Sequence, residues 1–408
     1  MSEATTDTTT GATGTRAAPA QATLGDEVPA PARGGGRLVS GVLLVVAAVL
    51  LLIAPFFLDP FWLRTGFGVF AAVVGALGLN LLVGNTGQLS LAHAFFLAVG
   101  ATTYCFVSGE PGGTATEVGG LGLPPVVGMV LGMVLAGVAG LLFSPIAARL
   151  RGIYLGVASI SLVFIGQHVL NVVPYITGGF NGRPAPTFTL FGFSFADEDP
   201  PLAVLGIPFR EPERLWYLGL FLAAGALWFA HNLLRSRAGR ALQTLRDSEV
   251  AAAVMGVDVQ VYKAKAFAVS SVYAGLAGVL TALSIGSIAP ESFALDLSVL
   301  YLAMVVLGGL GSVWGSVIGA AFVSALPVVF QRYADVLPLL SEPGQGGITA
   351  AQGARLLFGL AIVLIVLFEP AGLVGLGRRL TGGGRRRRTA AGSDSPVPTT
   401  PPAQGSTS

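Results

Sequence analysis

Long apolar runs alternate with short polar interruptions over most of the chain. Several runs reach about 20 residues, which is the helix length that crosses the hydrocarbon core of a bilayer. The pattern predicts an all-α polytopic membrane protein of about ten transmembrane helices, some of them discontinuous, with both termini cytoplasmic. The predicted spans are 38–58, 65–83, 89–107, 124–146, 153–173, 215–234, 266–285, two segments within 297–330, and 354–368.

Two glycine-rich breaks, at 84–88 and 308–312, interrupt apolar sequence without any charged residue. Non-helical backbone at membrane depth has to be packed inside protein, where its polar groups find partners. We therefore expect a discontinuous helix or a short turn at each break. Small residues at four-residue spacing predict faces for close helix packing; they are Gly128, Gly132, Ala136 and Gly140 in one span and Gly311, Gly315 and Gly319 in another.

The longest polar interruption with a helical pattern is 235–265. Asp247 or Ser248 can cap a helix there, Glu249 lies in the first turn where the helix dipole favours negative charge, and Gly256 can end it. A helix of two turns is marginal alone in water, so we expect it to dock on a surface. Its basic residues place it on the cytoplasmic side. The simpler alternative is an ordinary basic loop.

Composition and charge support the prediction of a multi-pass membrane protein. Of 408 residues 53% are hydrophobic and only 11% are charged, against roughly 25% charged residues in soluble domains. The ten-span map places 17 of the 23 Lys and Arg residues inside, as the positive-inside rule requires. We expect disordered tails at 1–36 and 378–408, the second basic and then rich in Pro, Ser and Thr, around a transmembrane domain at 37–377 with the loop 235–265.

The sequence lacks the marks of an enzyme. It has no phosphate-binding loop, since neither Lys263 nor Lys265 follows a glycine. Its three histidines lie too far apart in sequence for a metal motif. No acidic residue falls near mid-depth of a predicted span, where proton-coupled carriers keep one. We therefore expect no catalytic residues, no metal and no bound cofactor, with ATP bound by a partner subunit.

Several segments carry a resemblance to a known family. They include GNTGQLSLAHAFFLAVGA at 84–101, RLRGIYL at 149–155, DSEVAAAVMG at 247–256 and LYLAMVVLGGLGSVWG at 300–315. In order and spacing, from about 60 to 377, the chain resembles the M-type permease subunit of bacterial branched-chain amino acid ABC importers. The resemblance implies a multi-pass protein of the bacterial plasma (inner) membrane.

The resemblance also implies partners: a second homologous permease, two ABC ATPase subunits and an extracytoplasmic solute-binding protein, with no nucleic acid. Residues 249–256 would be the coupling helix that sits in a groove of the ATPase. The residues expected to couple there are Arg246, Glu249, Ala251, Ala252 and Gly256, with Ala251 to Ala253 forming the contact face.

Branched-chain amino acids are the expected substrate, and urea or short amides are the alternative within similar permeases. A different class, an ion-coupled secondary carrier built on broken helices, stays open, and a non-transporting scaffold is less favoured. The expected translocation pathway has Asn80, Gln88, Ser90 and His93 facing Ser159, Ser161 and Gln167. The alternative for each polar residue is hydrogen bonding between helices, worth roughly 0.6 kcal/mol.

Overall fold

The computed structural model describes residues 35–112, 119–150, 152–197, 202–204 and 207–333, with short pieces between 352 and 375. Two compact units are distinguished, Met1–Leu50 and Leu51–Ser408, and each is considered by itself. The described part of the first is the apolar helix α1 (Gly35–Ile53), which runs just past the boundary. Both expected tails lie outside the described residues, apart from the first residues of α1.

Helices make up most of the second unit. They are the 3₁₀ helix η1 (Ala54–Phe56), α2 (Pro60–Leu79) continued by the π-helix η2 (Asn80–Gly84), α3 (His93–Ser108), α4 (Pro125–Arg149), α5 (Ile153–Val172), α6 (Pro174–Thr177), η3 (Gly179–Asn181), α7 (Glu211–Arg235), α8 (Arg237–Asp247), α9 (Glu249–Val254), α10 (Val259–Ile285), η4 (Pro290–Phe293), α11 (Leu295–Gly308) and α12 (Val313–Arg332). The mostly helical fold confirms the predicted fold class in outline.

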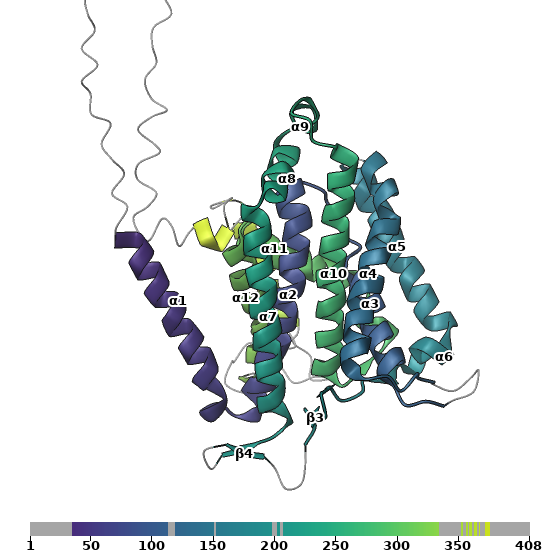
Figure 1. The fold of residues 1–408 in the computed structure, drawn as a ribbon, viewed down its shortest axis with the longest axis vertical. Helices are drawn as coiled ribbons and strands as arrows, with labels where there is room; N and C mark the ends of the chain where they lie inside the picture. Colours follow the sequence, from purple (N-terminus) through teal and green to yellow (C-terminus); the bar gives the residue numbers. More distant parts are fainter. Residues whose placement is uncertain are drawn as a thin grey trace, which may run out of the picture. The chain divides into compact units, whose positions relative to one another are not determined.

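Three short antiparallel strand pairs accompany the helices. Strand β1 (Arg183–Pro184) pairs with β6 (Ser287–Ile288), β2 (Thr189–Leu190) with β3 (Phe193–Ser194), and β4 (Leu202–Val204) with β5 (Ile207–Phe209). Strands β3 and β4 lie at one end of the long helices, called the hairpin end below, and α9 lies at the other, the α9 end (Figure 1). The polar loop 235–265 and the strand hairpins are therefore on opposite sides of the helices.

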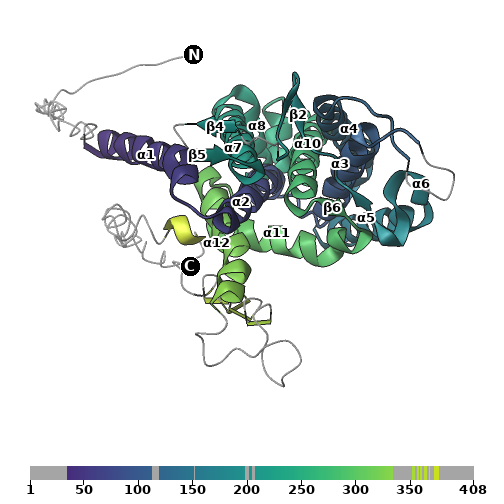
Figure 2. The same cartoon turned by 90° about the horizontal axis from the view of Figure 1, so that it is seen from below.

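Helix α10 is the centre of the packing. It contacts α2, α3 and α4, and Figure 2 shows it between α2 on one side and α3 and α4 on the other. A Cβ on Gly132 of α4 would lie 2.8 Å from the carbonyl oxygen of Gly100 in α3, and one on Gly275 of α10 would lie 2.9 Å from the carbonyl oxygen of Gly132. Backbones thus touch directly, which only small residues permit. The predicted face of Gly128, Gly132, Ala136 and Gly140 is buried throughout, which confirms it.

The exposed sides of the helices suit a lipid environment. Five helical segments among the described residues are long and apolar enough to cross a membrane: Pro60–Gly84, Pro125–Arg149, Ile153–Val172, Glu211–Arg235 and Val259–Ile285. Leu142, Phe221 and Trp228 point large apolar side chains outward from two of them. Helices α3 and α11 and the segment Val313–Val329 of α12 are apolar but shorter. The count of ten spans stays a prediction, because the span expected at 354–368 falls largely outside the described residues.

Both predicted breaks are present, with shifted boundaries. The first is longer than expected, since residues 87–92 are non-helical and α3 begins at His93 rather than at residue 89. The second separates α11 from α12, and Gly311 lies in that turn instead of on the helix face predicted for it. Gly315 does pack closely, because a Cβ there would lie 2.9 Å from the carbonyl carbon of Gly308.

The packing predicts the outcome of one substitution. Gly132→Leu should lower the free energy of unfolding by about 3 kcal/mol, because overpacking a tight contact forces the backbones of α3 and α4 apart. Gly225→Leu is the matched control, since a Cβ at Gly225 of α7 meets no atom within 4 Å. Membrane levels and denaturant unfolding of the purified proteins measure the effect. Equal stability of the two variants would show that the Gly132 face is not tightly packed.

Candidate functional site

Helix α2 ends in a π-helical segment whose polar groups are satisfied by side chains nearby in sequence. The Nδ2 of Asn85 donates to the carbonyl oxygen of Asn80 at 3.0 Å, and the Oγ1 of Thr86 donates to that of Leu82 at 2.6 Å. The Nε2 of Gln88 then donates to Thr86 Oγ1 at 2.9 Å. Widening of the helix leaves carbonyl groups without their usual partners, so these polar residues serve the break itself.

The start of α3 is held by serines from two other helices. The Leu91 amide donates to Ser159 Oγ in α5 at 2.8 Å, and the Ala94 amide donates to Ser298 Oγ in α11 at 2.9 Å. The first amides of a helix have no partner within the helix. Here the two hydroxyls accept from the non-helical segment 87–92 and from the first turn of α3, and so fix where the helix begins.

Asn80 joins the first break to the second. Its Oδ1 accepts from the Gly311 amide at 2.8 Å, and its Nδ2 donates to the Ser312 carbonyl oxygen at 3.1 Å. Gly311 has φ +81°, a left-handed conformation that favours glycine. Gly84 is also required, because a Cβ there would collide with Asn80 Oδ1 and the Gly311 amide. One buried amide side chain therefore fastens the turn between α11 and α12 to the end of α2.

Arg246 extends this contact to the loop 235–265. It lies near the end of α8, and its Nη1 donates to the Gly84 carbonyl oxygen at 2.6 Å. Helix α8 is amphipathic and buries Leu242 and Leu245, the former in a cluster with Leu82. We call Asn80, Gly84, Arg246, Gly311 and Ser312 the junction. It connects three segments that are distant in sequence, and one of them leads directly into α9.

The short helix α9 is braced from within the chain. Ser248 caps it by accepting from the Ala251 amide at 3.2 Å, and Glu249 Oε1 lies 2.7 Å from Lys263 Nζ. The Lys263 side chain is almost fully buried and that of Glu249 is 30% exposed, so solvent screens the pair only in part. Gly256 has φ +80°. The predicted cap, helix and glycine turn are therefore all present.

The outward face of α9 differs from the predicted one. Ala252 is fully buried against this chain, whereas Val250, Val254 and Met255 are 75%, 85% and 76% exposed. Three alanines in a row cannot all point outward on a helix, and the middle one faces inward. In this conformation Ala252 therefore presents no surface to a partner, and the coupling role expected of it stays a prediction. Arg246 and Glu249, predicted for the same contact, make their described bonds inside the chain.

The expected pathway residues fall into two groups. Asn80, Gln88, Ser90, His93 and Ser159 are all at most 5% exposed. Gln167 is half-buried and Ser161 is exposed, with its Oγ donating to the Val157 carbonyl oxygen. The structure thus brings Ser159 to the segment 87–92 but not Ser161 or Gln167. Asn80 and Ser159 match the alternative of hydrogen bonding between helices, whereas Gln88 and Ser90 bond to near neighbours and His93 Nε2 has no hydrogen-bond partner in the described part of the chain. A role in translocation stays a prediction.

Sequence reasoning missed two participants. Ser298 was not singled out, although a serine inside an apolar helix is a signal of a polar contact. Helix α8 was not predicted either, although Leu242 and Leu245 stand three residues apart in a polar stretch. Nothing in the linear sequence pattern indicates that Arg246 bonds to the Gly84 carbonyl oxygen inside the chain.

The junction predicts a measurable loss of stability. Asn80→Ala should lower the free energy of unfolding by about 2 kcal/mol, because it leaves a buried amide and a buried carbonyl without partners. Asn171→Ala is the control, since the exposed Asn171 bonds only within its own helix. Thermal unfolding of the purified chains compares them, and equal midpoints would contradict a structural role for Asn80.

Comparisons with known proteins place the chain in a family. A family model described as branched-chain amino acid transport system / permease component matches residues 66–367. The high-affinity branched-chain amino acid transport system permease protein LivM of Escherichia coli (strain K12) is 30% identical over 358 residues, covering 85% of this chain and 78% of the relative. LivM of Salmonella typhimurium is also 30% identical, over 75% of this chain and 68% of the relative.

A probable branched-chain amino acid transport permease protein LivM of Methanocaldococcus jannaschii is 26% identical, covering 76% of this chain and 91% of the relative. No solved structure matches the chain. The family match spans most of the sequence, including both breaks, the junction and α9. This chain therefore belongs to the permease component family of branched-chain amino acid transport systems and is a multi-pass membrane protein.

Proposed function

We propose that this chain is the transmembrane permease subunit of an ABC importer that moves branched-chain amino acids across the plasma membrane. The family and the names of the relatives support the substrate class. The observation that carries the proposal is α9, a short, capped and braced helix that exposes three large apolar side chains to solvent. In the proposed topology the chain crosses the membrane ten times, with both termini and α9 on the cytoplasmic side.

The partners of the proposed importer are a second homologous permease, two ABC ATPase subunits and an extracytoplasmic solute-binding protein that delivers the amino acid. Val250, Val254 and Met255 would enter a groove of one ATPase, which removes their apolar surface from water. Helix-in-groove binding of this kind is a recurring mode of protein recognition. The Glu249–Lys263 pair and the Ser248 cap hold α9 in shape behind the contact.

The junction provides a path from α9 into the membrane. ATP binding would close the ATPase pair and draw the α9 helices of the two permeases together. Displacement of α9 pulls on α8, and Arg246 passes the motion to the Gly84 carbonyl. Asn80 then carries it to the turn between α11 and α12. Hydrogen-bonded side chains and rigid helices are the physical means by which such coupling travels.

Two alternatives remain distinct from this proposal. A permease of the same family that carries urea or short amides would share the fold, and only the solute would differ. An ion-coupled carrier would use the broken helices without an ATPase. Uptake by vesicles that contain the complete complex separates the classes. We expect leucine uptake that requires internal ATP, competes with isoleucine and valine, and is unaffected by urea. Uptake that survives ATP depletion and follows an ion gradient would refute the ABC importer.

The revised face of α9 predicts which substitutions uncouple the ATPase. Val254→Asp should reduce ATPase co-purification by about tenfold, because burying an unpaired carboxylate costs at least about 1.4 kcal/mol. Val261→Asp is the matched control, an exposed valine at the same end but on α10.

Arg246→Gln should leave ATPase recovery intact while lowering uptake. Ala252→Arg is a poor probe, since Ala252 is buried and the change disturbs the loop itself.

Equal ATPase recovery with Val254→Asp and Val261→Asp, together with intact uptake, would show that α9 is only part of a basic connection. Normal uptake by the Arg246→Gln complex would contradict transmission through the junction but would leave docking at α9 untouched.

A further inference from the structure

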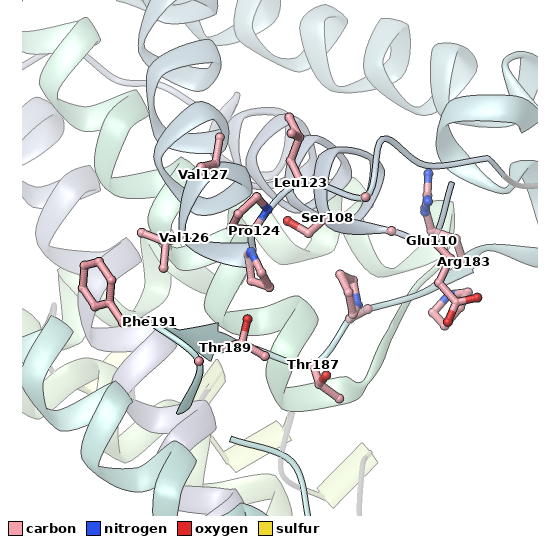
Figure 3. A pocket seen from close by; sticks show the side chains of 17 residues that line it. Ser108, Glu110, Leu123, Pro124, Val126, Val127, Arg183, Thr187, Thr189 and Phe191 are labelled. Atoms are coloured by element: carbon pink, nitrogen blue, oxygen red, sulfur yellow. The ribbon is translucent and has the colours of Figure 1, made fainter. Parts of the chain in front are cut away.

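A cavity of about 1140 Å³ is lined by residues of β1 and β2, among others. Strand β2 pairs with β3, which lies at the hairpin end, at the other end of the helices from α9 (Figure 1). Its walls come from the end of α3, the start of α4 and the segment that carries β1 and β2 (Figure 3). Neither the junction nor the expected pathway residues contribute to its lining. In the proposed topology this cavity faces the extracytoplasmic side, where a solute would arrive.

The cavity has a charged end and an apolar end. Glu110 and Arg183 are the charged residues that line it, and they lie together at one end (Figure 3). Phe191 and Val126 lie at the other end (Figure 3). An amphipathic solute with charges of both signs at one end and an apolar group at the other would match this division.

Arg183 is a buried cation without a carboxylate partner in the described part of the chain. Its side chain donates from Nη1 to the Ile176 carbonyl oxygen at 2.6 Å and from Nη2 to the Gly119 carbonyl oxygen at 2.9 Å. Its Nε has no partner there, and the residue is only 4% exposed. Burial lowers the pKa of Arg183 from its usual value, and the nearby Cys105 opposes that shift. A buried charge is costly unless it is paired, so a carboxylate from a solute would be stabilising beside it.

Glu110 supplies the opposite charge. It is exposed, and none of the ion pairs described between residues of this chain includes it. Ser108 stands two residues before it, and its Oγ is buried without a hydrogen-bond partner among the described residues. Most buried polar atoms in folded proteins have a partner. Among the described residues four buried hydroxyls have none, and the Ser108 hydroxyl is the one that belongs to a residue lining this cavity. The charged end thus offers a carboxylate beside the buried guanidinium, and the Ser108 hydroxyl lies nearer the middle of the cavity (Figure 3).

The apolar end is formed by an aromatic side chain held in a strained turn. Phe191 has φ +48° and is followed by Gly192 at +87°, the arrangement of a tight hairpin turn that normally excludes bulky residues. The hairpin is fixed by Arg214, whose Nη1 donates to the carbonyl oxygens of Ser194 at 2.7 Å and Ala196 at 2.9 Å. Phe191 itself is fully exposed, so packing within the described chain does not explain its strained conformation.

We infer that this cavity is a receiving site for a zwitterionic amino acid with an apolar side chain. Arg183 attracts the carboxylate, Glu110 binds the ammonium group, and Val126 and Phe191 contact the side chain. The inference rests on the proposed function, because it requires an amino acid to arrive at the hairpin end. It goes further in assigning this chain its own solute site, separate from the solute-binding protein.

Thiol labelling of the full complex in right-side-out vesicles tests the site. Cys105 is the only cysteine and is fully buried, so a single introduced thiol is the one that an external charged reagent reaches. Thr189→Cys lines the cavity, and Leu190→Cys, the next residue of β2, does not. Leucine at ten times its dissociation constant should slow the labelling of Thr189→Cys by about tenfold, by mass action. Leucinamide, without a carboxylate, and 4-methylpentanoate, without an ammonium group, should protect far less.

Glu110→Gln added to Thr189→Cys should abolish protection by leucine without changing the labelling rate in its absence. The site is refuted if Thr189→Cys does not react, if leucine leaves its rate unchanged, or if leucine slows Leu190→Cys equally. Equal protection by all three compounds would also refute it. ATP-dependent leucine uptake is measured in vesicles of the unmodified complex. ATP-dependent uptake without protection by leucine would refute the cavity assignment alone. Protection by leucine together with uptake that does not depend on ATP would refute the ABC importer alone.

Discussion

The structure depends on one constraint, which is that backbone polar groups in a membrane interior must find partners within the protein. Two broken segments meet this requirement through side chains from distant helices. Asn80 closes the turn between α11 and α12, while Ser159 and Ser298 accept from the start of α3. Helix α3 packs directly against α5 and α11, which brings these short hydroxyl side chains within reach of its start. The same helix makes the tight glycine contact with α4 at Gly100.

Arginine side chains satisfy carbonyl groups of irregular backbone at both ends of the helices. Arg246 donates to the Gly84 carbonyl at the α9 end, and Arg183 and Arg214 donate to loop carbonyls at the hairpin end. Irregular backbone presents carbonyl oxygens that no helix or strand satisfies, and a guanidinium group can serve several of them at once. At the α9 end this has a functional consequence, since the loop proposed to receive the ATPase is bonded to the membrane-embedded break. At each end, the arginine hydrogen bonds hold loop backbone in place next to exposed apolar side chains.

Those exposed side chains mark the two surfaces on which transport would depend. Val250 and Val254 project from α9, Met255 projects from the residue that follows it, and Phe191 projects from the hairpin at the other end. Each is carried by a short element that is fixed by hydrogen bonds or ion pairs behind it. A short helix or hairpin is too small to be stable alone, so its orientation is set by the helices beneath it. Movement of those helices would change both surfaces together.

The sequence by itself determined the apolar helices, the positions of both glycine breaks and the small-residue face of α4, because these follow from local period and composition. It also narrowed the cap to Asp247 or Ser248 and placed the turn at Gly256, which depend on neighbouring residues alone, and the structure has the cap at Ser248. Only the tertiary structure decided that Asn80 bonds to Gly311, that Ser298 holds α3, and that Ala252 faces inward. Asn80 and Gly311 are 231 residues apart, and no local pattern encodes such a partner. The sequence did not reveal the outward face of α9 either. The helix carries apolar side chains on all sides, and only the surface beneath it decides which of them are buried.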